Sequence, residues 1–226
     1  MMNFNFNISE LIFVMPELFL LAAISCILLF DLYVKEELRK FTYHLSQLAL
    51  LITGLLAFNL IGESATIFSG TFVLDTLGST FKVFIAGFSI IALVYSRHYL
   101  SVHGLLRNEY FILALMSILG MLVMVSGHSL LTLYLGLEIM SLSLYALIAT
   151  ARDRAFAIEA ALKYFVLGAI ASGLLLYGMS MIYGITGNLD IAEIASFASL
   201  VTLVPQETLI LNFGLVFLVI GVAFKL

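Results

Sequence analysis

The sequence predicts an all-α polytopic membrane protein with about seven transmembrane helices. Of its 226 residues, 63% are hydrophobic and 11% are charged, whereas soluble domains average about 45–50% apolar and about 25% charged residues. The mean hydropathy is +1.16. The apolar residues form long runs of about 20 residues, the length that spans a bilayer as a helix. This composition excludes ordinary soluble enzymes, disordered chains and disulfide-stabilised secreted domains.

The predicted spans follow one another with short connections. They lie at about 11–33, 42–62, 77–96, 110–127, 129–149, 156–183 and 208–226. No Lys or Arg precedes the first run, so the basic region of a cleaved signal peptide is missing and we expect this run to be retained as a span.

The longest polar or mixed connections are 69–76 and 187–207. In the second connection, Gly187-Asn188 is a turn signal. A weakly amphipathic piece follows from Asp190 to Leu203 and ends before Pro205. We expect this piece to lie along the membrane surface.

Basic residues lie in alternate connections. Those outside the spans are Lys35, Arg39, Lys40, Arg97, Arg107, Arg152 and Arg154. The N-terminus and the connections after the second, fourth and sixth spans have none. The positive-inside rule therefore predicts an integral membrane protein whose basic connections are cytoplasmic and whose N-terminus is outside.

Glu138 lies near the middle of the fifth predicted span. At about 1.5 Å per residue it is roughly 14 Å from the start of the helix, in an apolar core about 30 Å thick. A charge there costs at least about 2.5–3.5 kcal/mol without a partner, a proton or water. Tyr134, Ser141 and Tyr145 share its helix face, and this polar stripe must face protein or water. We expect a functional acid, and the alternative is a polar contact that only holds helices together.

Lys163, in the sixth span, has two interpretations. Glu159 precedes it by one helical turn, so it is either a snorkelling lysine with a local counter-ion or a buried amine that accepts and releases a proton. Gly168, Ser172 and Gly173 form a small-residue face on the same span. Such faces let helices pack closely, so we expect their role to be structural.

Two more lysines lie in predicted spans. Lys225 is a cytoplasmic flank if the seventh helix starts near Thr208, and it is deep in the membrane if that helix starts well outside the apolar core. Lys82 lies a few residues into the third span, and we expect it to snorkel to the outer surface.

Other functional classes lack support in the sequence. No nucleotide, zinc or redox-cofactor motif occurs, no basic stripe suggests nucleic acid, and the single Cys26 excludes an intrachain disulfide. The remaining feature is a set of ionisable groups of both signs inside the membrane. Such groups pass protons when side chains or water bridge them, because the charge of one alters how tightly the next holds its proton.

Two stretches resemble a known family. Residues 133–147, LYLGLEIMSLSLYAL, resemble the fifth-helix signature of the antiporter-like subunits of proton-pumping NADH–quinone oxidoreductase, respiratory complex I. Residues 159–165, EAALKYF, with the small residues and tyrosines up to Gly187, are similar to the sixth helix of its subunit N branch. Pro16-Glu17 and the fourth span match more weakly, and the resemblance covers almost the whole chain.

The resemblance implies a fold of about fourteen helices with two inverted five-helix repeats. On that pattern 1–108 is an N-terminal three-helix region, 109–226 is the first part of the first repeat, and the chain is an N-terminal part of such a subunit.

The resemblance also assigns roles to single residues. Glu138 and Lys225 form a switchable ion pair, and Lys163 modulates it and relays protons on the cytoplasmic side. The supporting residues are Tyr134, Ser141, Tyr145 and Glu159.

The resemblance implies a proton-translocating subunit in a bacterial inner membrane, in contact with lipid, neighbouring antiporter-like subunits and other membrane subunits of complex I. No cofactor is expected on this chain; NADH, FMN, iron–sulfur clusters and a quinone such as ubiquinone belong elsewhere in the complex. The alternatives are a cation/proton antiporter or hydrogenase membrane subunit of the same superfamily, or a membrane scaffold that transports nothing.

Overall fold

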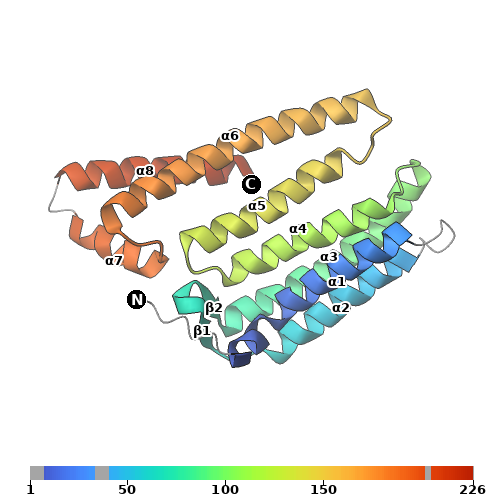
Figure 1. The fold of residues 1–226 in the computed structure, drawn as a ribbon, viewed down its shortest axis with the longest axis horizontal. Helices are drawn as coiled ribbons and strands as arrows, with labels where there is room; N and C mark the ends of the chain where they lie inside the picture. Colours follow the sequence, from blue (N-terminus) through green and yellow to red (C-terminus); the bar gives the residue numbers. More distant parts are fainter. Residues whose placement is uncertain (1–7, 34–40, 202–204, 226) are drawn as a thin grey trace.

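The computed structural model describes residues 8–33, 41–201 and 205–225, which form a bundle of long helices (Figure 1). The elements in chain order are η1 (Ile8–Val14), α1 (Met15–Tyr33), α2 (Phe41–Asn59), β1 (Ala65–Ile67), η3 (Phe68–Gly70), β2 (Phe72–Leu74), α3 (Thr76–Val102), α4 (Asn108–Ser126), α5 (Leu130–Ile148), α6 (Ala155–Thr186), α7 (Ile191–Val201) and α8 (Pro205–Lys225).

Seven helices in the described part of the chain are long and apolar enough to cross a membrane. They are η1 joined to α1 (Glu10–Tyr33), α2, α3, α4, α5, α6 and α8, and they coincide with the seven predicted spans. Many of their large apolar side chains point outward, as in a protein whose solvent is lipid. The all-α membrane class is confirmed.

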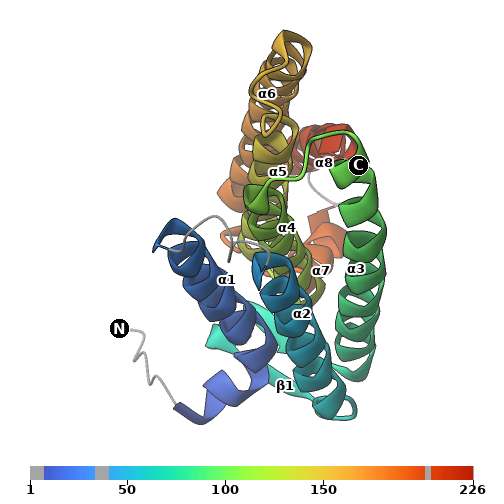
Figure 2. The same ribbon diagram turned by 90° about the vertical axis from the view of Figure 1, so that its right-hand side faces the viewer.

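Helix α4 lies at the centre of the packing, between α5 and the group formed by α1, α2 and α3 (Figures 1 and 2). Leu115 and Leu122 of α4 are fully buried against Leu20 of α1 and Leu50 of α2. Helix α6 packs on α5 and has its most extensive contact with α8. A second apolar cluster, which includes Leu175 of α6, joins these helices.

A short hairpin was not predicted. The connection 69–76 was expected to be polar or mixed, yet β1 and β2 pair antiparallel, with Ile67 opposite Phe72. Strands of three residues are too short to show an alternating pattern. Phe72 also forms a bridge with Gly127, so the hairpin joins the end of α4 and provides hydrogen bonds for backbone groups near the helix ends.

The connection between α6 and α8 contains a helix, as its pattern predicted. The Asp190 side chain accepts a hydrogen bond of 2.8 Å from the Ala192 N–H and caps the start of α7. The predicted end of this piece, Leu203, lies outside the described residues. Pro205 begins α8, a position where its missing N–H costs no helical hydrogen bond.

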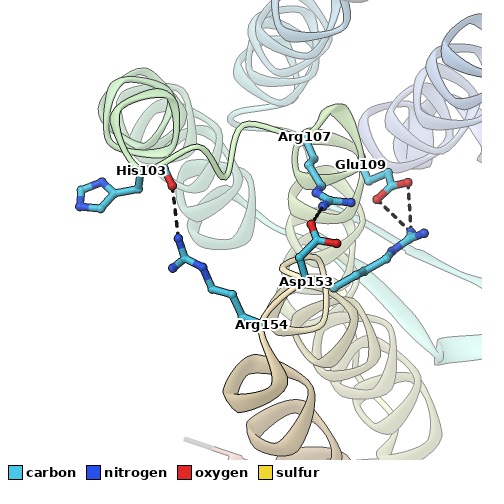
Figure 3. A network of polar contacts seen from close by, with 6 residues as sticks. His103, Arg107, Glu109, Asp153 and Arg154 are labelled. Atoms are coloured by element: carbon cyan, nitrogen blue, oxygen red, sulfur yellow. Dashed lines mark hydrogen bonds and ion pairs between the residues drawn. The ribbon is translucent and has the colours of Figure 1, made fainter.

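Arginines in the α3–α4 and α5–α6 connections link these two connections to each other (Figure 3). Arg107 pairs with Asp153 at 2.6 Å, and Arg152 pairs with Glu109 at 3.0 Å. Arg154 donates to the His103 carbonyl at 3.3 Å. The basic residues between the first two spans, Lys35, Arg39 and Lys40, lie outside the described residues.

Candidate functional site

Glu138 and Lys225 form an ion pair between α5 and α8. The Lys225 ammonium contacts Oε1 of Glu138 and lies 6.0 Å from the centroid of the Tyr134 ring. The Lys225 side chain is 1% exposed and that of Glu138 is 18% exposed. Because the ammonium is buried and the carboxylate is largely shielded from solvent, each charge is stabilised by the other.

The start of α8 decides the depth of Lys225. Helix α8 begins beyond the end of α6 and ends beside the middle of α5 and α6 (Figure 1). The Lys225 side chain therefore reaches the level of Glu138, which lies in the middle of α5. The sequence left both positions open because the level at which a helix begins depends on its packing.

Close contact between α6 and α8 holds Lys225 in place. One turn before the lysine, a Cβ added to Gly221 would lie 2.7 Å from the Leu175 side chain and 2.9 Å from the Ala171 carbonyl. Only glycine permits the two backbones to approach this closely.

Ser172 of α6 also contacts the acid. Its hydroxyl lies 2.5 Å from Oε1 of Glu138 and 3.0 Å from the Gly168 carbonyl, so it can donate to either oxygen. The expectation that Ser172 serves packing alone was wrong. A helical serine can satisfy its hydroxyl with the carbonyl one turn earlier, here that of Gly168, so the sequence carried no signal for the contact with Glu138.

Tyr145 continues the polar stripe of α5 into the contact with α6. Its ring meets Tyr164 edge-on, with 4.6 Å between the centroids. A Cβ added to Gly168 would lie 1.9 Å from the Tyr145 hydroxyl, so this glycine makes room for the phenol. Ser141, on the same α5 face, is buried.

Lys163 and Glu159 lie apart from this cluster. They pair with each other at 2.5 Å on the outer face of α6, with side chains 71% and 63% exposed. In the described part of the chain, no hydrogen bond or ion pair joins either residue to Glu138 or Lys225. The structure therefore brings together Glu138, Lys225 and Tyr134. For Lys163 it shows the first of the two interpretations, a local counter-ion, which is Glu159.

Lys82 forms a second buried ion pair. Its ammonium lies 2.5 Å from Oε1 of Glu17, and the two side chains are 1% and 5% exposed. The ring of Phe72, in the hairpin, lies 5.0 Å from the ammonium. The expectation that Lys82 snorkels to the outer surface was wrong, because an acid on α1 neutralises it inside the bundle. The signal was the similar depth of Glu17 and Lys82 in their spans.

Comparison with known proteins places the chain in a family. Residues 127–226 match the family profile described as NADH:quinone oxidoreductase/Mrp antiporter, TM. A protein of Ruthia magnifica subsp. Calyptogena magnifica named NADH-quinone oxidoreductase subunit N is 66% identical over 228 residues, which cover 100% of this chain and 47% of that protein. A protein of the same name from Halorhodospira halophila is 48% identical, over 98% of this chain and 45% of that protein.

Solved structures have the same fold. A chain of respiratory complex I from Thermus thermophilus is 27% identical and matches with a TM-score of 0.72, over 92% of this chain and 43% of that chain. A chain of the archaeal membrane-bound sulfane sulfur reductase matches with a TM-score of 0.76 at 23% identity, which supports the fold alone. The chain spans about half the length of the curated relatives it matches. It belongs to the NADH:quinone oxidoreductase/Mrp antiporter family of membrane proteins, with NADH-quinone oxidoreductase subunit N as its named relatives.

Proposed function

We propose that this chain is part of a proton-translocating membrane subunit of a proton-pumping NADH–quinone oxidoreductase. The observation that carries the proposal is the partly buried Glu138–Lys225 pair, with the Ser172 hydroxyl on the same carboxylate. The subunit N relatives support the choice of complex.

The pair provides a two-state element. A proton that reaches Glu138 neutralises the carboxylate and removes its attraction for the Lys225 ammonium. The unpaired ammonium is then costly in its buried site, which favours loss of its proton or a new partner. Loss of the proton from Glu138 restores the pair. Ser172 can pass a proton, since a hydroxyl both donates and accepts hydrogen bonds.

The remaining residues have secondary roles in this proposal. Lys163 modulates the pair and relays protons on the cytoplasmic side, with Glu159 as its counter-ion; Tyr134, Ser141 and Tyr145 support Glu138 from its own helix. The proposed location is the bacterial inner membrane, and in the proposed orientation the N-terminus is outside.

The driving reaction occurs elsewhere in the complex. NADH oxidation by FMN and iron–sulfur clusters and the reduction of a quinone belong to other subunits, and this chain contributes no redox centre. Its partners are the lipid bilayer and the other membrane subunits, including neighbouring antiporter-like subunits.

The test is Glu138→Gln in the full-length subunit, assembled in its complex. Glutamine keeps the shape of the side chain but carries neither the charge nor the exchangeable proton. We expect normal assembly and a fall of at least about tenfold in NADH-driven proton pumping, which is a loss of about 1.4 kcal/mol at the barrier. The measurement is proton uptake by inverted vesicles, normalised to the assembled complex.

A matched control is Glu63→Gln, at an exposed acid in a connection between spans, which we expect to pump normally. Normal pumping by assembled Glu138→Gln would sink the proposed role. If the variant instead fails to assemble while the few assembled complexes pump normally, the scaffold alternative holds. Lys225→Met is expected to lower pumping as Glu138→Gln does.

A further inference from the structure

A cavity of about 960 Å³ opens at the end of the bundle that carries the arginines. It lies against the start of α4, between the ends of α1, α3 and α5, and outside the Glu138–Lys225 cluster. Its lining reaches from the connections, at Arg107 and Arg152, down to Leu28 and Ile112, which lie within the spans.

The wall of the cavity has two chemical zones. Arg107 and Arg152 line the cavity from the connections, and Arg97 lines it from α3, between one and two turns before the end of that helix. On α1, Leu28 lines the part within the span and Leu32, one turn later and next to the helix end, lines the mouth; both are exposed. This order, cationic groups at the membrane interface and exposed leucines beside them, matches the order of phosphate and acyl chain in a phospholipid.

Within residues 8–33, 41–201 and 205–225, the ion pairs of the cavity leave one lining guanidinium without a carboxylate partner. Arg107 has Asp153 as its partner, as Figure 3 shows, and Arg152 has Glu109. The other lining carboxylate, Asp31, accepts hydrogen bonds of 2.8 Å from Thr42 and Asn108.

Arg97 differs from the other two arginines. Its guanidinium lies 4.2 Å from the centroid of the Tyr43 ring, and it forms no ion pair within residues 8–33, 41–201 and 205–225. Stacking on a ring fixes the plane of a guanidinium and leaves its N–H groups free to bind an anion.

We propose that this cavity binds an anionic phospholipid, with its phosphate on Arg97 and an acyl chain along Leu28 and Leu32. Arginine suits a phosphate because its planar fork donates two parallel hydrogen bonds. Basic pockets between membrane helices bind anionic headgroups in this manner. The partnered arginines, Arg107 and Arg152, then shape the mouth of the cavity without providing the main charge.

The first test measures lipid retention by the assembled complex that contains the full-length subunit. The complex is delipidated, reconstituted with equal amounts of phosphatidylglycerol and phosphatidylcholine, and repurified, and its bound lipids are counted by mass spectrometry. We expect Arg97→Gln to lower retention of phosphatidylglycerol at this site by about fivefold, the effect of one interfacial basic residue, with phosphatidylcholine unchanged. The matched control is Arg154→Gln, because Arg154 binds the His103 carbonyl outside the cavity lining.

The second test needs no arginine variant. A photo-crosslinking residue at Leu32 is expected to capture phosphatidylglycerol in preference to phosphatidylcholine. Equal capture of both lipids would overturn the proposal. So would a crosslink to a neighbouring subunit in place of lipid, or equal retention of phosphatidylglycerol by Arg97→Gln and wild type in the first test. Neither readout depends on proton pumping, so the proposed function and this inference can fail separately.

Discussion

At the scale of single residues, the described part of the chain contains two Glu–Lys pairs between helices, one fully buried and one partly buried, with different surroundings. In both pairs an aromatic ring lies near the ammonium, Tyr134 for Lys225 and Phe72 for Lys82. Glu138 also has the Ser172 hydroxyl. The Glu17–Lys82 pair has no further hydrogen-bond partner in the described part of the chain. We therefore expect the first pair to exchange protons and the second to have a structural role alone, in which each charge neutralises the other.

The Glu17–Lys82 pair predicts a pattern of stabilities. Glu17→Met or Lys82→Met alone leaves one buried charge unpaired, so each should destabilise the subunit by about 3–5 kcal/mol. The double variant leaves no charge and should recover most of that loss. Thermal unfolding of the purified complex and the amount of subunit in membranes measure the effect. A double variant as unstable as the single ones would show that the pair itself is needed.

Ser172 predicts a smaller effect on transport. Ser172→Ala removes a hydrogen bond to a charged group, a contribution of about 1.5–3 kcal/mol, and it also removes the hydroxyl that can pass a proton. We expect slower NADH-driven pumping with assembly unchanged. Ser172→Thr keeps a hydroxyl and should pump faster than the alanine variant, and Ser180→Ala, at an exposed serine of the same helix, should match wild type. Equal pumping by Ser172→Ala and wild type would remove Ser172 from the proton path.

At the scale of elements, the contact between α5 and α6 depends on one small residue. Gly168 accommodates the Tyr145 hydroxyl, whereas Gly173, on the same helix, has nothing within 4 Å of an added Cβ. The two glycines therefore form a matched pair, one at a helix contact and one beside open space.

Substitution of this pair should separate packing from helix propensity. Gly168→Ala should displace Tyr145 and destabilise the α5–α6 contact by about 1–3 kcal/mol, the usual cost of overpacking. Gly173→Ala should be neutral, or stabilise the helix by up to about 1 kcal/mol. Unfolding midpoints of the two variants in detergent provide the comparison. Similar midpoints would mean that Tyr145 moves aside without cost.

At the scale of the whole molecule, the arginines at one end predict the orientation in the membrane. In a Cys26→Ser background, Glu63→Cys lies in a connection expected outside, and His103→Cys lies in a connection expected inside; both positions are exposed. The positive-inside rule predicts that a membrane-impermeant maleimide labels Glu63→Cys in intact cells and labels His103→Cys only after permeabilisation. The reverse labelling would invert the topology.

The spans and the central acid could be predicted from the sequence because both are local properties. A run of about 20 apolar residues is visible in any window of the chain, and the depth of Glu138 follows from helix rise alone. Helix α7 was likewise visible as an amphipathic piece. The hairpin was not, because its strands of three residues pair only where α2, α3 and α4 place them together.

The sequence by itself determined the fold class, the number of spans and the presence of ionisable groups within them. The family resemblance implied the pairing of Glu138 with Lys225, but for the residues taken by themselves only the tertiary structure decided which of these groups meet. Glu138 contacts Lys225 and Ser172, and Lys82 is buried against Glu17. The physical reason is that composition and periodicity act along one helix, whereas a charge pair depends on the level at which two helices start and on how closely they pack, as Gly221 allows for α6 and α8.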